Sequence, residues 1–175
     1  MDHRNVLVAY FSRTGHTRVL AEGIARALGA DLEEIRDRTE RTGIAGYLRS
    51  GLEALFGVSA EIDRPRHDPA RYDAVVVGGP VWNASVSTPV RTYLWLERDH
   101  LPALACFASY GGVGAERALG QMEAIARKRP IATLAVREIE TAAGVPRERI
   151  KAFAAGVRRG LERRRARRGA RSRAA

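Results

Sequence analysis

Apolar and polar positions along this 175-residue chain switch repeatedly between strand-like and helix-like spacing. Runs of strand length, most of them apolar, occupy residues 6–11, 31–35, 74–79, 104–109 and 131–136. Helical spacing of apolar residues predicts helices over 17–28 and 44–56, from Pro89, around 119–126 and from Pro146, and residues 58–71 predict a loop. Because strands and helices alternate, we expect an α/β domain in which helices cover both faces of a parallel sheet.

Length and composition fit one soluble domain. Hydrophobic residues make up 45% of the chain, and no apolar run approaches the ~20 residues of a membrane span. No signal-peptide pattern precedes the first strand, so we expect a cytoplasmic protein. The single cysteine, Cys106, excludes an intrachain disulfide, and its apolar neighbours predict a buried small side chain.

Positive charge is concentrated at one end of the chain. The formal net charge is +10, yet residues 157–175 hold nine Arg and one Glu, a net +8, and the remainder is nearly neutral. We therefore expect a folded domain over residues 1–157 and an arginine-rich tail over 158–175 that is frayed or disordered. The alternative role for the tail is weak contact with nucleic acid or an anionic membrane.

The first strand ends at a turn rich in hydroxyl groups, and a helix follows without a linker. This order places a helix N-terminus, with its unpaired N–H groups and positive dipole end, at the carboxyl edge of the sheet. Ser12, Thr14 and Thr17 add hydroxyl groups, and Gly15 lets the backbone approach a ligand closely. The turn suits a phosphate monoester, although a hydroxyl-capped turn that binds nothing is the alternative.

This turn, Ser-Arg-Thr-Gly-His-Thr, resembles the Ser/Thr-x-Thr-Gly-x-Thr loop with which flavodoxins hold the phosphate of FMN. The resemblance implies a flavodoxin-like three-layer sandwich with a five-stranded parallel sheet of order 2-1-3-4-5. It also implies non-covalently bound FMN as the cofactor. The binding residues that it implies in this turn are Ser12, Arg13, Thr14, Gly15, His16 and Thr17.

The segment after the third strand resembles the same family, in which Tyr-Asp and an apolar strand lead to Gly-x-Pro-x-Trp and a small-residue turn. Trp82 is the candidate wall for a flat flavin ring, and the following turn offers backbone groups to the edge of the ring. A core tryptophan is the alternative. The binding residues implied here are Pro80, Val81, Trp82, Asn83, Ala84 and Ser85.

A glycine-rich turn follows the fourth strand, where family members carry a similar Ser/Thr-x-Gly-Gly turn beside the flavin. Its glycines allow close approach of the backbone to a ligand. Tyr110 either stacks on the ligand or covers the sheet edge. The residues implied as binding are Ser109, Tyr110, Gly111, Gly112 and Gly114.

Two features depart from the family pattern. Asn83 and Ala84 stand where relatives with Pro-x-Trp-Trp-Gly have an aromatic residue and Gly, and Ala resists the positive φ that accompanies one-electron chemistry in flavodoxins. The domain is also nearly neutral, whereas electron-transfer flavodoxins present an acidic docking face. We therefore expect FMN binding without the usual flavodoxin partner set.

Three functions stay open. The first is an FMN-dependent electron carrier, and the second is a small oxidoreductase of the NAD(P)H:quinone or protoporphyrinogen type. The third is a redox-silent module that binds a phosphate-bearing metabolite. The sequence has no Walker loop, no Cys-x5-Arg phosphatase loop, no acidic receiver pocket and no metal-ligand spacing, so we assign neither catalytic nor metal-binding residues. Expected partners are a redox protein or a quinone- or tetrapyrrole-like substrate, with the chain a monomer or a homodimer.

Overall fold

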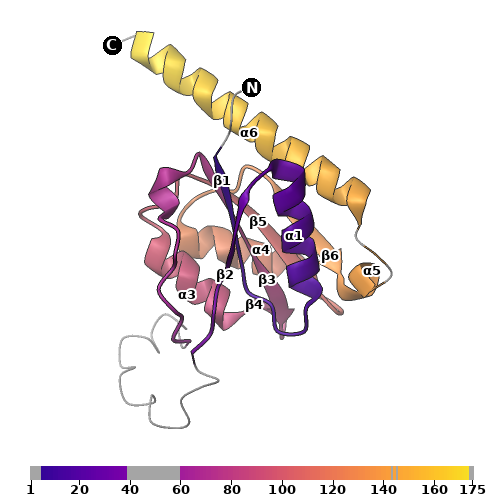
Figure 1. The fold of residues 1–175 in the computed structure, drawn as a ribbon. Coiled ribbons are helices and arrows are strands. Elements are labelled where there is room, and N and C mark those ends of the chain that lie inside the picture. The colour runs from indigo at the N-terminus through magenta and orange to yellow at the C-terminus, as the bar shows by residue number, and fades with distance from the viewer. Residues whose placement is uncertain (1–4, 39–59, 143, 145, 174–175) are drawn as a thin grey trace.

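The computed structural model describes residues 5–38, 60–142, 144 and 146–173, and these form a layered α/β fold (Figure 1). The helix predicted over 44–56 lies outside the described residues. The elements are β1 (Val6–Tyr10), α1 (His16–Leu28), β2 (Asp31–Glu34), the short 3₁₀ helix η1 (Pro69–Arg71), β3 (Ala74–Trp82), β4 (Ser85–Val86), α3 (Thr88–Glu97), β5 (Ala103–Tyr110), α4 (Ala115–Ala126), β6 (Thr133–Arg137), α5 (Glu138–Ala142) and α6 (Arg147–Arg173).

The sheet confirms the expected topology. Its parallel strands lie in the order β2-β1-β3-β5-β6, which is the predicted order of the five predicted strands. The labels advance by one after β3 because the two-residue strand β4, which the sequence pattern did not predict, pairs antiparallel with the end of β3. Such sheets bind ligands outside the carboxyl ends of their strands.

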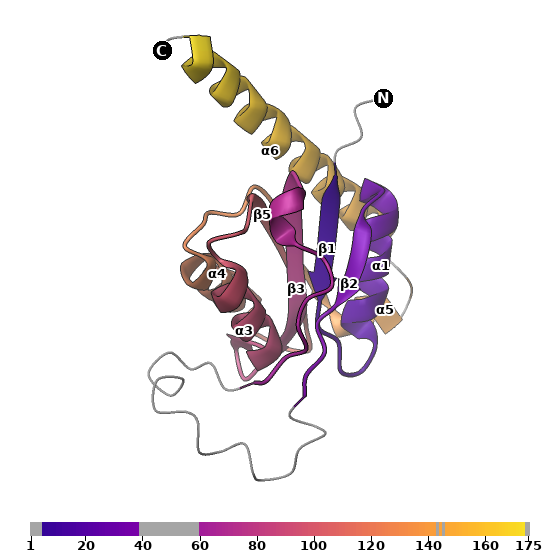
Figure 2. The ribbon, with the colours of Figure 1, turned by 60° about the vertical axis from the view of Figure 1, so that its left-hand side comes forward.

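Two apolar cores lie on the two faces of the sheet, and Figure 2 shows the helices that cover them. Along β1, Val6, Val8 and Tyr10 face the core under α1 and α6, whereas Leu7 and Ala9 face the core under α3 and α4. This alternation follows from the two-residue period of a strand. Cys106 is fully buried, as predicted, in the second core.

The third strand runs further than its apolar pattern indicated. The pattern predicted an end at residue 79, but β3 continues through Trp82, and the chain then folds back as β4. Asn83 (φ 48°) and Ala84 (φ 56°) form the two-residue turn between the strands, with the paired positive φ angles of a type I′ hairpin. The backbone twist of a type I′ turn matches the twist of the two strands that it joins. This match favours the pairing of residues 81–82 with residues 85–86, after Gly78 and Gly79 of β3.

The last helix continues without interruption from the body of the fold into the arginine-rich segment and ends at Arg173. Fraying of residues 158–175 in solution stays a prediction. Within the described part of the chain, no helix combines the length and the apolar character that crossing a bilayer requires.

Candidate functional site

Three loops that are distant in sequence meet in one cleft at the carboxyl edge of the sheet. We call them loop 1 (residues 12–17), loop 2 (residues 80–85) and loop 3 (residues 109–114). The cleft has a volume of about 690 Å³, within the range of small-molecule sites. Its lining consists of Arg13, Thr14, Pro80, Val81, Trp82, Asn83, Ala84, Gly111, Gly112, Val113 and Glu138.

Loop 1 is shaped by the hydroxyl group of Ser12. Its Oγ accepts hydrogen bonds from the backbone N–H groups of Gly15 and Arg18, both at 3.2 Å, which turns the chain from β1 into α1. Gly15 precedes the helix with φ 95°, a backbone conformation that residues other than glycine rarely adopt. Ser12 therefore acts in this structure as a helix-capping residue, and its hydroxyl oxygen is already hydrogen-bonded.

The first turn of α1 leaves backbone donors available to a ligand. Among the described residues, the N–H groups of His16 and Thr17 have no acceptor within the protein, as expected for the start of a helix. The exposed side chains of Arg13 and Thr14 line the cleft beside this turn. Two backbone N–H groups, a hydroxyl group and a guanidinium group give loop 1 the donor set of an anion site.

Thr17 does not line the cleft, because its hydroxyl group forms a hydrogen bond with another buried side chain. Its Oγ1 lies 2.7 Å from the Oγ of Ser109, and both residues are buried. This hydrogen bond connects the start of α1 with the end of β5, 92 residues along the chain. The pair holds loop 1 against loop 3, which is a structural role for two residues that the sequence suggested as ligand contacts.

Trp82 stands at the wall of the cleft, half-buried at the end of β3. Its ring packs edge-on against Phe11, with ring centroids 5.5 Å apart and an interplanar angle of 89°. This contact at the end of β1 fixes the plane of the indole ring. Trp82 therefore packs against the core and also lines the cleft, and its contact with a flavin ring stays a prediction.

The hairpin turn of loop 2 rests on the start of α4. A Cβ built on Gly114 would lie 2.4 Å from the Cα of Ala84, so only glycine fits there. Gln121 of α4 accepts a hydrogen bond from the N–H of Val86 at 2.9 Å and donates one to the Oγ of Ser85 at 3.3 Å. Ser85 and Gly114 therefore support the cleft from behind and do not line it.

A comparison with known proteins identifies the family. The family model described as flavodoxin matches residues 5–135, three quarters of the chain. This chain belongs to the flavodoxin family. Among proteins of curated function, none matches its sequence.

Several solved structures share the fold of this flavodoxin-family protein. A flavoprotein in complex with FMN from Lactobacillus acidophilus has a TM-score of 0.59 at 22% identity, over 80% of this chain and 97% of that chain. An NADH:FMN oxidoreductase in its apo form has a TM-score of 0.53 at 19% identity, over 89% of this chain and 88% of that chain. Rubredoxin oxygen:oxidoreductase from Desulfovibrio gigas has a TM-score of 0.58 at 18% identity, over 91% of this chain and 36% of that chain. These likenesses show the shared fold.

The flavodoxin-family cleft has a fourth side that the sequence reasoning missed. Glu138, the first residue of α5, lines the cleft with its carboxylate on the side of Gly111. Val113 also lines it and is 82% exposed. Glu138 directly follows β6 and lies two residues after the predicted end of that strand, so the rule that ligands bind beyond the carboxyl ends of strands would have indicated it.

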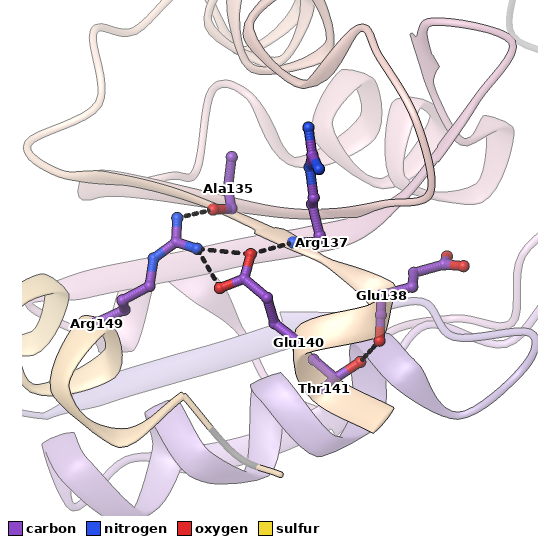
Figure 3. A network of polar contacts seen from close by, with 6 residues as sticks. All are labelled: Ala135, Arg137, Glu138, Glu140, Thr141 and Arg149. Carbon is purple, nitrogen blue, oxygen red and sulfur yellow. Dashed lines mark hydrogen bonds and ion pairs between the residues drawn. The ribbon is translucent and has the colours of Figure 1, made fainter. Parts of the chain in front are cut away.

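A polar network holds α5 in place, as Figure 3 shows. Nη1 of Arg149 donates to both carboxylate oxygens of Glu140, at 2.9 and 2.7 Å, and Arg149 also donates to the carbonyl oxygen of Ala135. The N–H of Arg137 donates to Glu140 at 3.1 Å. The Arg149 guanidinium, followed by the Arg137 N–H, lowers the pKa of the Glu140 carboxyl below its ordinary value. Glu138 points away from this network in Figure 3.

His16 joins α5 to loop 1. Its Nδ1 lies 2.9 Å from Oγ1 of Thr141, whose hydroxyl group donates to the carbonyl oxygen of Glu138 at 2.7 Å. The imidazole therefore forms a hydrogen bond with Thr141 of α5 in this structure and does not line the cleft. Tyr110, half-buried at the end of β5, does not line it either.

A second groove adjoins the cleft on the β2 side. It has a volume of about 600 Å³ and shares Arg13 with the cleft. Its other walls come from the segments at the ends of β1 and β2, including Phe11 and Glu34, and from Asp63. Among the described residues, no group of three or more His, Cys, Asp or Glu side chains is arranged to hold a metal ion.

Proposed function

We propose that the cleft binds one FMN non-covalently and that the protein transfers electrons through it. The observation that carries this proposal is the convergence of three loops on a single cleft, with Arg13 and Thr14 beside the start of α1 at one part and the aromatic ring of Trp82 at another. The fold neighbour from Lactobacillus acidophilus was solved in complex with FMN, which supports the same ligand class here.

The residues at the loop 1 end fit a phosphate group. In the part of the chain that the structure describes, the N–H groups of His16 and Thr17 at the start of α1 have no acceptor. Thr14 and Arg13, which line the cleft, contribute a hydroxyl group and a permanent positive charge. A Cβ on Gly15 would meet nothing within 4 Å, so the backbone here is open on that side. A dianionic phosphate is the ligand that such donors stabilise best.

The residues at the other end fit a flat ring. Trp82 gives an apolar wall whose orientation Phe11 fixes, and Gly111 and Gly112 offer backbone groups without side chains in the way. A bound flavin supplies the redox chemistry, whereas the protein orients it, limits water and sets its electrostatic surroundings. In this cleft the carboxylate of Glu138 would oppose additional negative charge on the ligand.

A second candidate function is a small FMN-dependent oxidoreductase acting on a quinone- or tetrapyrrole-like substrate or on NAD(P)H. The groove that shares Arg13 with the cleft favours it, because a substrate lying there would be next to the cofactor. The NADH:FMN oxidoreductase among the fold neighbours supports the same reaction class. A stepwise anaerobic reduction separates the two: a one-electron-reduced flavin accumulates in a carrier, whereas a two-electron enzyme passes directly to the fully reduced flavin.

The site assignment has its own test, which uses FMN and riboflavin as paired ligands. The double substitution Arg13→Gln/Thr14→Ala removes two phosphate donors, so FMN binding should weaken at least about tenfold, on the order of one charge-assisted hydrogen bond. Riboflavin lacks the phosphate, and its affinity should stay unchanged. Arg129→Gln/Thr133→Ala, at exposed positions outside the cleft, is the matched control. Equal losses for both flavins, or no loss for FMN, would refute the assignment.

A further inference from the structure

The last helix has two halves of different character. α6 contains 27 residues, which corresponds to about 40 Å of helix. Its first half packs on the sheet through Ile150, Phe153, Val157 and Leu161, all of them buried. After Leu161, every side chain from residue 162 to 167 is exposed. Figures 1 and 2 both show this second half extending past the body of the fold, at the end of the sheet where β1 begins.

Arginines lie on several sides of the extended half of α6. At 100° per residue, the consecutive exposed residues Arg163, Arg164 and Arg165 lie on three different sides of the helix, and Arg167 is also exposed. Arg165 pairs with Asp73 of the body at 3.2 Å, and Glu162 is the only acidic residue in 157–175. Between residues 162 and 173 the sequence has no large apolar side chain, so this half has no hydrophobic face.

We infer that the extended half of α6 binds double-stranded nucleic acid through its phosphates, without sequence preference. The DNA major groove, about 12 Å wide, admits an α-helix and presents phosphates on both of its sides, which suits a helix that carries arginines on several sides. Arginine is suited to phosphate because its planar guanidinium can donate two parallel hydrogen bonds. A membrane surface fits less well, because helices that lie in it bury an apolar face that this segment lacks.

The inference is independent of the cofactor proposal. The extended half of α6 lies near the start of β1, and its contact with Asp73, just before β3, marks the amino edge of the sheet. The cleft lies at the carboxyl edge, at the ends of β1, β3 and β5. Because a duplex on α6 would leave the cleft open, duplex binding should be the same with and without FMN.

The test uses the full chain and a 20-base-pair DNA duplex of arbitrary sequence, with binding followed by fluorescence anisotropy at several salt concentrations. Arg163→Gln/Arg164→Gln/Arg167→Gln should weaken duplex binding at least tenfold in low salt. It should also reduce the slope of log K against log salt by about 0.9 for each phosphate that the variant no longer neutralises. The control, Arg64→Gln/Arg129→Gln/Arg147→Gln, removes the same charge from exposed positions elsewhere and should change little. Circular dichroism checks that the variants are folded.

Three results would overturn the inference. The first is no duplex binding by the wild-type chain, and the second is an equal loss in the control triple, which would indicate net charge alone. The third is binding to vesicles rich in phosphatidylserine but not to the duplex. A loss confined to the α6 triple, with unchanged FMN affinity, would support it and would stand even if the cofactor proposal failed.

Discussion

Ala84 and Gly114 lie in direct contact at the back of the cleft, with Ala84 in the hairpin turn of loop 2 and Gly114 at the start of α4. A Cβ built on Gly114 would stand 2.4 Å from the Cα and 2.6 Å from the Cβ of Ala84. Both residues have positive φ, 56° and 94°. The contact joins loops 2 and 3, so the shape of the cleft depends on a glycine that does not itself line it.

Gly114→Ala should therefore displace the hairpin and strain the backbone. We expect the free energy of unfolding to fall by about 1–3 kcal/mol, and FMN affinity to fall with it. Gly120→Ala is the matched control within α4, because its added Cβ meets nothing within 4 Å and Ala favours the helix. Urea unfolding of both variants checks this, and equal stability of the two would contradict the proposed contact.

Ala84→Gly acts on the other partner. Glycine removes the strain of a positive φ but makes the unfolded chain more flexible, so the free energy of unfolding should rise by no more than about 1 kcal/mol. Ala124→Gly, at an exposed position in α4, should instead lower it by about 1 kcal/mol. If both substitutions destabilise the protein alike, the strain assigned to Ala84 is absent.

The buried hydrogen bond between Thr17 and Ser109 predicts coupling between loops 1 and 3. Either Thr17→Val or Ser109→Ala leaves a buried hydroxyl group without its partner and should cost about 1–3 kcal/mol. The double substitution removes both hydroxyl groups, so it should cost clearly less than the sum of the two. A double-mutant cycle by chemical denaturation measures this, and additive losses would mean that the bond contributes nothing to stability.

The Glu140–Arg149 pair predicts a specific dependence of stability on pH. Because the folded pKa of Glu140 lies below its ordinary value of 4.5, its contribution is present above that pH and is lost as the pH falls through the folded pKa. Glu140→Gln and Arg149→Gln should both reduce the loss of stability on acidification. Unfolding midpoints measured above and below pH 4.5 test this. If both variants kept the pH dependence of stability of the wild-type protein, the Glu140–Arg149 pair could not be its source.

The residues explain which features the sequence could predict. The apolar runs of β1, β3 and β5 are almost entirely buried, so their pattern is unambiguous, and their alternation with helices predicts a parallel sheet. The order of the strands came from the resemblance to flavodoxins. The β4 hairpin was missed because the positive φ of Ala84 is locally unfavourable and depends on packing against Gly114 and Gln121. The short α5 was missed because Arg149, from the next helix, secures it.

The site residues also differ in how far the sequence could predict their contacts. Loop sequences indicated which segments approach the cleft, and Arg13, Trp82 and Gly111 do line it. They did not indicate which hydroxyl groups bond within the protein, because the partner of Thr17 lies 92 residues away and that of His16 lies 125 residues away. Such pairings depend on tertiary contacts that no local pattern contains.

The most direct test of the central claim is an equilibrium titration of the purified chain with FMN, followed through flavin and tryptophan fluorescence. The account predicts saturation at one FMN per chain. It also predicts that Trp82→Phe reduces the quenching, whereas Trp95→Phe, on α3 and outside the cleft, does not. Absence of saturable binding, or a site whose quenching depends on Trp95, would contradict it.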